Sequence, residues 1–420
     1  MTRSPRSPLQ RLNVVVAGGG IAGVETLLAL RTLAGDALSL TLVSPQAQLH
    51  YRPFAVREPF DGRATRHYDL GEICHDLDVV HRRDALAAVD AAARTIVTEG
   101  GERIAYDALV LAPGARASAA LPHAHTFLAE ADPGSLHWVV RELEQGVVRR
   151  VAFVVPPGHT WPLPLYELAL MTAARAREAG VEDAELTLVT PEGAPLGLFH
   201  GAGSAAVAEQ LAQSRIAFVG DAYAHDYDGG TLTLTPGERM LAAERVVALP
   251  VLSGPAIAGV PCDADGFVHV DERGRVPGLA DVYAAGDATT FAIKQGGIAA
   301  QQADAVATLI SRAAGARVPQ PSTRPLLRAV LFSGDGPLYL RATITGGESV
   351  VSSASRHCPW WPPHKVAARY LAPYLADRDE SDRGTAGRHL RAVPAPGAGT
   401  AVVHHDGDPG GIELLGHERR

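Results

Sequence analysis

The stretch LNVVVAGGGIAGVETLLAL, residues 12–30, decides the fold of this chain. Its first part is apolar and β-branched and predicts a buried parallel strand, and the part from Val24 onward has helical composition. Between them stand Gly18, Gly20 and Gly23, at the spacing G-x-G-x-x-G. Strand, glycine turn and helix in this order predict a dinucleotide-binding unit, in which the helix N-terminus offers free N–H groups to a pyrophosphate.

The glycines and the residues between them are candidate contacts of the bound dinucleotide. Gly18 would allow the tight turn, Gly20 would let the pyrophosphate approach the backbone, and Gly23 would let helix and strand pack closely. Ile21 and Ala22 lie at the helix start, where N–H groups are free. A merely glycine-rich turn is the alternative, and the strand and helix around the motif argue against it.

A second strand is predicted over residues 38–43, where LSLTLV alternates and then becomes apolar. A dinucleotide fold usually places an acidic residue at the end of this strand, where it bonds the ribose hydroxyls. Here the chain reads Ser44, Pro45 and Gln46, so the acid is missing. Either the serine or the glutamine bonds the ribose hydroxyls in place of the acid, or no residue does. Ser44 is therefore a candidate cofactor contact.

Composition and charge exclude a nucleic-acid partner. The 420 residues predict about two to three domains, and 46% hydrophobic with 20% charged residues is ordinary for a globular protein. The formal net charge is −8, and no block of Lys or Arg is long enough for a nucleic-acid surface.

The sequence contains no sign of a leader, a membrane span or a metal site. Neither the N-terminus nor any later apolar run has the length of a signal or of a ~20-residue span, so a cytoplasmic location is expected. Cys74, Cys262 and Cys358 lie far apart, which excludes a zinc ribbon and a local redox disulfide. Histidines with metal-ligand spacing on a predicted helix are lacking, so no metal is expected.

A second α/β unit is predicted from about residue 150 onward, because strands and helices alternate again. The loop after its first strand, where a second pyrophosphate would lie, reads PPGHTWPLPL over residues 156–165. Proline has no N–H group to donate, and Trp161 fills space that a pyrophosphate would need. The second unit is therefore predicted to keep the fold and to have lost the standard nicotinamide site.

Two other stretches carry candidate contacts of a planar cofactor. The segment LHYRPFAVREPF, residues 49–60, has the composition of an ordered loop, in which Arg52 and Pro53 lie against the cofactor or simply pack at the surface. A predicted strand ends in APGA, where Ala112 and Gly114 permit a turn close to a ligand or form an ordinary strand-ending turn.

A further predicted strand, residues 282–285, ends at Gly286 and Asp287, and a helix is predicted to start near Gly296. A carboxylate at a strand end can accept hydrogen bonds from the hydroxyls of a polyol chain. A helix N-terminus aimed at a flavin would stabilise the negative charge that forms on reduction. Asp287 as a simple helix cap is the alternative.

Residues 322–376 predict a small C-terminal domain with two strands, which either closes over the cofactor or forms a homodimer contact. Trp360 and Trp361 are interpreted as core or interface residues, or as a peripheral membrane contact beside a short amphipathic helix. From residue 377 onward no periodicity is present, and a disordered tail is predicted.

The predicted fold class is α/β, with two Rossmann-like dinucleotide-binding domains, one inserted in the other, plus the small C-terminal domain. The predicted divisions are a disordered N-terminus (1–11), the first domain in two parts (12–117 and 253–316), the second, degenerate domain (118–252), the C-terminal domain (322–376) and the tail (377–420).

With these residues placed, the chain resembles the FAD-dependent pyridine nucleotide-disulfide oxidoreductase family, whose members have two FAD/NAD(P)-binding domains. Within it, the chain looks most like the branch of sulfide:quinone oxidoreductases and type II NADH dehydrogenases. The motifs that carry the resemblance are GGGIAG (18–23), APGA (112–115), AAGDAT (284–289) and KQGGIAAQQA (294–303). The resemblance implies FAD in extended form, with Asp287 on the ribityl chain and Lys294, Gln295 and Gly296 near the isoalloxazine.

The chain departs from the family at the donor side. It lacks the CxxxxC pair of the disulfide reductases, and it has no cysteine in the segment 159–162, where sulfide:quinone oxidoreductases carry one of two redox cysteines. It also lacks the second GxGxxG motif of the NADH dehydrogenases. Lys294 is the candidate for stabilising reduced flavin. Glu167 and His159, beside the altered loop, are either candidates to face the flavin or ordinary surface polar groups.

The resemblance implies an FAD-dependent oxidoreductase that passes electrons from a small donor through flavin to a quinone or another small acceptor. One alternative is an NAD(P)H-dependent reductase with a quinone or ferredoxin-type acceptor, in which NAD(P)H binds the unusual loop. The other is a catalytically poor flavoprotein with a binding role.

Overall fold

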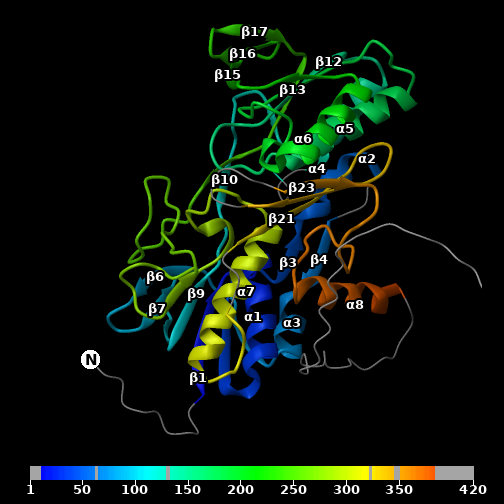
Figure 1. The fold of residues 1–420 in the computed structure, drawn as a ribbon. Helices are drawn as coiled ribbons and strands as arrows, with labels where there is room; N and C mark the ends of the chain where they lie inside the picture. The colour runs from blue at the N-terminus through cyan, green and yellow to red at the C-terminus, as the bar shows by residue number, and fades with distance from the viewer. Residues whose placement is uncertain (1–10, 62–64, 129–132, 321–323, 345–350, 384–420) are drawn as a thin grey trace, which may run out of the picture. The chain divides into compact units, whose positions relative to one another are not determined.

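A computed structural model describes residues 11–61, 65–128, 133–320, 324–344 and 351–383 of the chain (Figure 1). Residues 1–10 of the predicted disordered N-terminus, and the predicted tail from residue 384 onward, lie outside these described residues. Within the described ranges, no helix combines the length and the apolar character that crossing a membrane requires.

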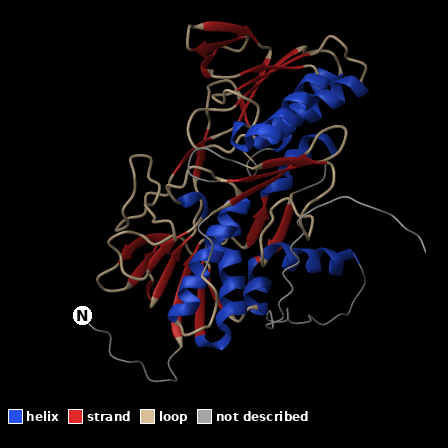
Figure 2. Cartoon of the chain, in the orientation of Figure 1, coloured by secondary structure: helices blue, strands red, loops and turns tan. Residues whose placement is uncertain are grey.

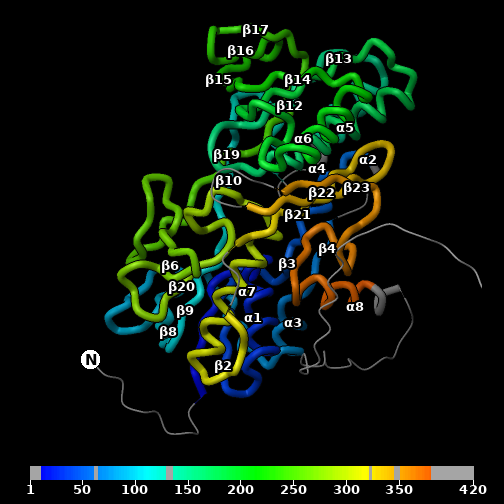
Figure 3. The backbone as a smooth tube through the Cα atoms, viewed as in Figure 1, coloured from blue at the N-terminus to red at the C-terminus, as the bar shows by residue number. Residues whose placement is uncertain are grey.

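The first sheet has five strands, all parallel, in the order β20-β9-β1-β2-β5. The edge strand β20 comes from far along the chain: it pairs with β9, although the whole second unit lies between them in the sequence (Figure 3). The strands are β1 (Leu12–Ala17), β2 (Leu38–Val43), β5 (Val79–Arg82), β9 (Ala108–Leu111) and β20 (Val282–Ala284).

Both faces of this sheet are covered, which explains why β1 is a continuous apolar run instead of an alternating one. Val14 and Val16 pack in the core shared with α1 (Ile21–Ala34) and α7 (Gly296–Ala313), two helices that lie side by side (Figure 1). Val15 packs on the opposite face, against the antiparallel strands β6 (Leu86–Asp90), β7 (Thr95–Thr98) and β8 (Arg103–Ala105).

The second unit has its own parallel five-stranded sheet, in the order β11-β18-β12-β13-β14. Helices accompany this sheet, and an antiparallel ribbon extends from it (Figure 2). The strands are β11 (His125–Thr126), β12 (Arg150–Val154), β13 (Glu185–Val189), β14 (Ile216–Val219) and β18 (Arg245–Ala248), the helices α4 (Pro133–Glu144), α5 (Leu163–Glu178) and α6 (His200–Gln213), and the ribbon β15 (Tyr223–Tyr227), β16 (Thr231–Thr235) and β17 (Arg239–Ala242).

Two short strands mark where the chain passes between the units. β10 (Arg116–Ser118) and β19 (Val251–Ser253) pair antiparallel, one as the chain enters the second unit and one as it leaves. The predicted α/β class with two Rossmann-like sheets is therefore confirmed.

The C-terminal part forms a three-stranded antiparallel sheet followed by a helix. The strands β21 (Leu326–Leu331), β22 (Leu338–Thr343) and β23 (Ser352–Ser355) share a core with α5, and α8 (Leu371–Arg383) follows. The prediction of a disordered tail from residue 377 was wrong for its first seven residues, because α8 continues to Arg383. Arg378 of this helix forms a 2.8 Å ion pair with Glu72 of α3 (Leu70–Asp76), a partner that local sequence does not reveal.

The segment 49–60 was predicted as a loop, and this prediction was also wrong. Gln48–Tyr51 is a strand, β3, paired antiparallel with β4 (Arg66–Asp69), and the 3-10 helix η2 (Arg52–Arg57) and α2 (Glu58–Asp61) follow. Leu49 and Tyr51 are buried in the core of the first unit, and this alternating burial is what makes the segment a strand.

Candidate functional site

A cavity of about 810 Å³ opens at the carboxyl ends of β1, β9 and β20, the edge where parallel α/β sheets bind their ligands. The loop before α5 and the C-terminal part of the chain supply its other walls. Most of the predicted site residues line this cavity: Gly18, Gly20, Ile21, Ala22, Arg52, Pro53, Ala112, Gly114, Glu167, Gly286, Asp287, Lys294, Gln295 and Gly296. Three predicted residues, Gly23, Ser44 and His159, are not among its lining residues.

The glycine turn is shaped for a close ligand. Gly18 has φ +117°, and a Cβ there would lie 2.1 Å from the carbonyl oxygen of Ala112. A Cβ on Gly23 would lie 1.8 Å from the carbonyl oxygen of Gly18, so Gly23 serves packing and not the ligand directly. A Cβ on Gly20 would meet no protein atom within 4 Å. The turn is thus packed tightly from behind and open toward the cavity.

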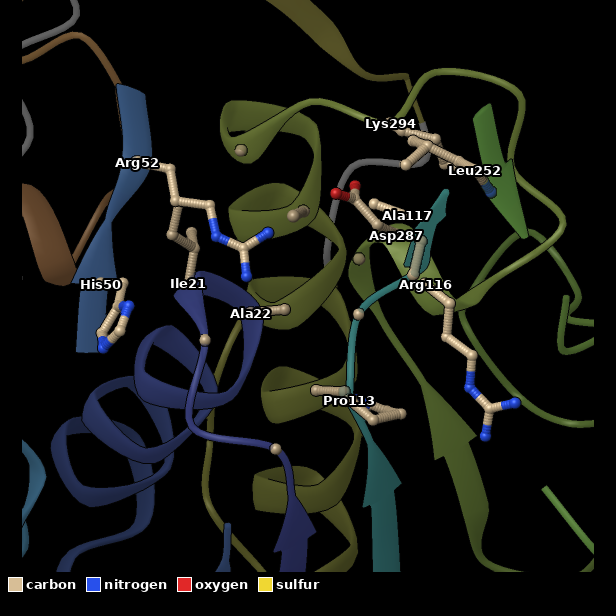
Figure 4. Close-up of a pocket in the computed structure, with 18 of the residues that line it drawn as sticks. Ile21, Ala22, His50, Arg52, Pro113, Arg116, Ala117, Leu252, Asp287 and Lys294 are labelled. Atoms are coloured by element: carbon tan, nitrogen blue, oxygen red, sulfur yellow. The ribbon is translucent and has the colours of Figure 1, made fainter. Parts of the chain in front are cut away.

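The start of α1 is suited to an anion. Its N-cap is Gly20, which has no side chain to bond the first N–H groups. These groups and the helix dipole favour a phosphate at this end. Figure 4 shows the Arg52 guanidinium entering the cavity above Ile21, so a cation faces the same region.

Asp287 follows β20 and points its carboxylate into the cavity (Figure 4). Among the described residues, none donates a hydrogen bond to this carboxylate, and it does not cap α7, whose N-cap is Gln295. Burial raises the pKa of Asp287, while the charges of Lys294 and Arg52 act to lower it. The carboxylate is therefore an acceptor held between two cations and left open for hydroxyl groups of a ligand.

Lys294 is 4% exposed and lies beside Asp287 at the wall of the cavity. Its ammonium donates to the carbonyl of Thr289 and lies 3.8 Å from the centroid of the Phe267 ring. Burial lowers its pKa to about 8, and the charge of Asp287 opposes this shift. Lys294 can thus change protonation near neutral pH.

The side chain of Gln295 is occupied by the protein itself. Its Oε1 accepts from the N–H of Ile298 at 2.9 Å, and its Nε2 donates to the carbonyl of Arg328 at 2.9 Å. Gln295 therefore fixes the start of α7 against β21.

Glu167 lies in the cavity wall with a partner that sequence reasoning missed, Lys365. The Lys365 ammonium is 2.7 Å from both carboxylate oxygens, and the side chains are 7% and 0% exposed. Glu167 also accepts from the N–H of Phe332 at 2.9 Å. Burial raises the pKa of Glu167 to about 7 against the charge of Lys365, and burial lowers the pKa of Lys365 against the charge of Glu167.

His159 is not brought to this cavity. It lines a separate cavity of about 150 Å³, between the loop before α5 and residues 292–294, and its ring lies edge-on against Phe267. Trp161 is half-buried and packs against Phe199, with ring centroids 6.2 Å apart, and it lines both cavities at the loop where a second pyrophosphate is expected.

These residues fit FAD in extended form. The open turn at Gly20 and the cation of Arg52 suit a pyrophosphate, and the unpartnered carboxylate of Asp287 suits a polyol chain. Because β20, β9, β1, β2 and β5 are neighbours in that order, these subsites follow one another along the edge of the sheet.

Comparisons with known proteins agree with this geometry. Residues 12–148 match the family model described as pyridine nucleotide-disulphide oxidoreductase. A sulfide-quinone reductase of Aquifex aeolicus (strain VF5) is 30% identical over 104 residues, which is 24% of this chain and 24% of that protein. The sequence match thus spans about a quarter of the relative.

The similarity of folds covers much more of the chain. The crystal structure of the sulfide:quinone oxidoreductase from Aquifex aeolicus has a TM-score of 0.71 at 21% identity, over 82% of this chain and 87% of that chain. A ferredoxin reductase of the CYP199A2 system from Rhodopseudomonas palustris has a TM-score of 0.60 at 18% identity, over 81% and 84%. The family resemblance is thus confirmed over residues 12–148, and the fold of these solved structures extends over most of the chain.

Proposed function

We propose that this chain is an FAD-dependent oxidoreductase of the pyridine nucleotide-disulphide type and that it passes electrons from a small donor to a quinone. The observation that carries this proposal is the buried pair of Lys365 and Glu167 in an otherwise largely apolar wall of the cavity. Apolar residues that line it include Val56, Phe127, Leu163, Leu249 and Val330.

The pair supports quinone chemistry because quinone reduction consumes protons as well as electrons. A quinone takes two electrons and two protons to become a quinol. Bound FAD would supply the electrons, which the donor replaces. Burial raises the pKa of Glu167 and lowers the pKa of Lys365, so the pair holds a proton that could pass to a bound quinone and be replaced from water.

The other residues bind and polarise. The turn at Gly18 and Gly20 and the guanidinium of Arg52 would hold the pyrophosphate, and Asp287 would hold the ribityl hydroxyls. Lys294 and the N-terminus of α7 at Gly296 present positive charge, which would stabilise charge on the reduced cofactor.

The runner-up is an NAD(P)H-dependent reductase with a ferredoxin-type partner. The complete parallel sheet of the second unit and the likeness to the ferredoxin reductase favour it. Against it stand the indole of Trp161, which packs against Phe199 in that loop, and the small volume, about 150 Å³, of the cavity beside the loop. Ligand pockets for drug-sized molecules have about 300 Å³ or more.

If the acceptor is a membrane quinone, the protein must reach it from the membrane surface. We therefore propose that the exposed Trp361 contacts that surface. Trp361 is 88% exposed, whereas the neighbouring Trp360 packs edge-on against Tyr339. A second proposal for the C-terminal part is a homodimer contact.

The acceptor half of the reaction can be tested without knowing the donor. The bound flavin is photoreduced under argon and mixed with a short-chain quinone or with oxidised ferredoxin, and the return of the flavin absorbance is followed. We expect fast reoxidation by the quinone only. Reoxidation by ferredoxin and not by quinone would overturn the proposal in favour of the runner-up, and inertness to both would favour a binding role.

A further inference from the structure

The adenosine end of the cavity lacks the acid that a dinucleotide fold usually supplies, and the structure indicates a replacement. Asp287 follows β20 and Gly18 follows β1, so the strand order places the ends of β2 and β5 on the other side of the phosphate turn. Gln46, after β2, and residues 85–87, after β5, line this end of the cavity.

Ser44 is buried behind the phosphate turn and does not line the cavity. Its N–H donates to the carbonyl of Arg82 at 3.1 Å, and a Cβ on Gly19 would lie 2.8 Å from its hydroxyl oxygen. Its hydroxyl donates to Oε1 of Gln46 at 2.9 Å. Ser44 is therefore fixed on the protein side and holds the Gln46 amide at the cavity wall.

We propose that Gln46, positioned by Ser44, binds the adenosine ribose of FAD in place of the missing acid. Ser44 occupies the amide oxygen, so the Nε2 group is left as the donor, and no acceptor among the described residues takes it. Where a carboxylate accepts from ribose hydroxyls, this amide donates to a hydroxyl oxygen, and a neutral donor gives a weaker bond than a carboxylate acceptor.

Glu99 is the alternative candidate for binding the adenosine ribose. It lies between β7 and β8, also lines the cavity, and its N–H donates to the carbonyl of Ala85 at 2.8 Å. Its carboxylate would restore the usual acid from another element of the fold. The two residues make opposite predictions for single substitutions.

The test measures the dissociation constants of FAD and of an FAD analogue that lacks both adenosine ribose hydroxyls, by quenching of flavin fluorescence on the apoprotein. Gln46→Ala should weaken FAD binding about fivefold, the value of one neutral hydrogen bond, and leave analogue binding unchanged. Ser44→Ala should act in the same direction with a smaller effect. Gln145→Ala, a matched change at an exposed glutamine outside the cavity lining, should change neither constant.

Two further variants complete the test. Gln46→Glu still accepts from Ser44 and restores an acid, so it should bind FAD at least as tightly as the unaltered chain. The proposal would be overturned if Gln46→Ala bound FAD as tightly as the unaltered chain, or if this variant lost the same affinity for FAD and for the analogue. It would also be overturned if Glu99→Ala alone lost affinity for FAD and not for the analogue. Circular dichroism confirms that each variant is folded. Since the test needs only FAD binding, its outcome is independent of the proposed acceptor.

Discussion

Two helices of this chain, α1 and α5, each follow the central strand of a parallel sheet, β1 and β12, but the turns before them differ. The turn before α1 is closed behind by Gly18 and Gly23 and open at Gly20. The turn before α5 ends in Pro162, which has no N–H group, and Trp161 is packed against Phe199. We infer from this comparison that topology alone does not make a dinucleotide site, because the turn must also leave backbone N–H groups free.

The two helices also carry a buried glutamate at the same position. Glu25 stands four residues after Ile21, the first residue of α1, and Glu167 stands four residues after Leu163, the first residue of α5. Both hold the C-terminal segment 365–371. Glu167 binds the ammonium of Lys365, while Glu25 accepts the N–H groups at the start of α8, including that of Tyr370 at 2.9 Å. Only the partner of Glu167 brings a charge to the cavity.

The largest effect is expected at the turn before α1 when a glycine is replaced by alanine, and the matching substitution in the turn before α5 is the control. Gly18 has φ +117° and Gly158 has φ +108°, so alanine is strained at both, but only at Gly18 would its Cβ meet backbone, 2.1 Å from the Ala112 oxygen. Gly18→Ala should lose FAD, with affinity reduced at least ~100-fold because the turn must open. Gly158→Ala should keep its flavin and lose about 1 kcal/mol of stability. Flavin absorbance measures the cofactor content of the two variants, and thermal unfolding measures their stability. Equal flavin loss in the two variants would show that backbone strain, and not the contact with Ala112, causes the loss.

The buried pair of Glu167 on α5 and Lys365 in the C-terminal part is tested by Lys365→Arg and Glu167→Gln. Arginine keeps the charge but does not release a proton, and glutamine keeps the shape. Both should slow reoxidation of the photoreduced flavin by quinone by about 100-fold, the usual value of acid–base catalysis. Because breaking a buried pair destabilises a protein, flavin content and unfolding are measured alongside, with the neutral double variant Lys365→Met/Glu167→Gln as control. Unchanged reoxidation in folded variants would assign the pair a structural role.

A smaller effect is expected for Asp287→Asn. The change removes the charge of an open acceptor, so FAD should bind about tenfold more weakly, as for one hydrogen bond to a charged group. Asp228→Asn, in an exposed turn of the second unit, is the matched control and should bind FAD normally. Fluorescence titration gives both constants, and equal affinities would remove Asp287 from the site.

The smallest effect concerns Asp304, which lies beside Glu25. Burial and the nearby Glu25 raise the pKa of Asp304 to about 9, so the folded protein holds a proton that the unfolded chain releases at lower pH. Stability should therefore fall as the pH rises from about 4 toward 9. Asp304→Asn should reduce this fall, with a gain in Tm of about 2–4 °C at pH 9 relative to pH 6. Parallel pH profiles for the two proteins would contradict the raised pKa.

The glycine turn between β1 and α1 could be predicted from the sequence because its signal is local. Gly18, Gly20 and Asp287 stand at strand ends whose spacing is visible in the chain. Lys365 could not be placed this way, since its partner Glu167 is brought to it only by tertiary packing. One signal was present, however. Of 38 Lys and Arg residues only Lys294 and Lys365 are lysines, and both line the cavity, where a group that releases its proton is useful and arginine is not.

The strand at Gln48–Tyr51 and the end of α8 were missed for the same physical reason. Each is held by a segment far away in the chain, β4 for the strand and Glu72 for the helix. Short segments have weak intrinsic preferences, so such partners decide their conformation.

The measurement that tests the comparison most directly is anaerobic mixing of the purified yellow protein with NADH, NADPH or sulfide, followed at the oxidised flavin band. If only the first unit binds a dinucleotide, neither pyridine nucleotide should bleach the flavin rapidly, and the search moves to small donors, beginning with sulfide. Rapid bleaching by NADH or NADPH would contradict this account, because it would show that the proline-rich turn before α5 still admits a nicotinamide.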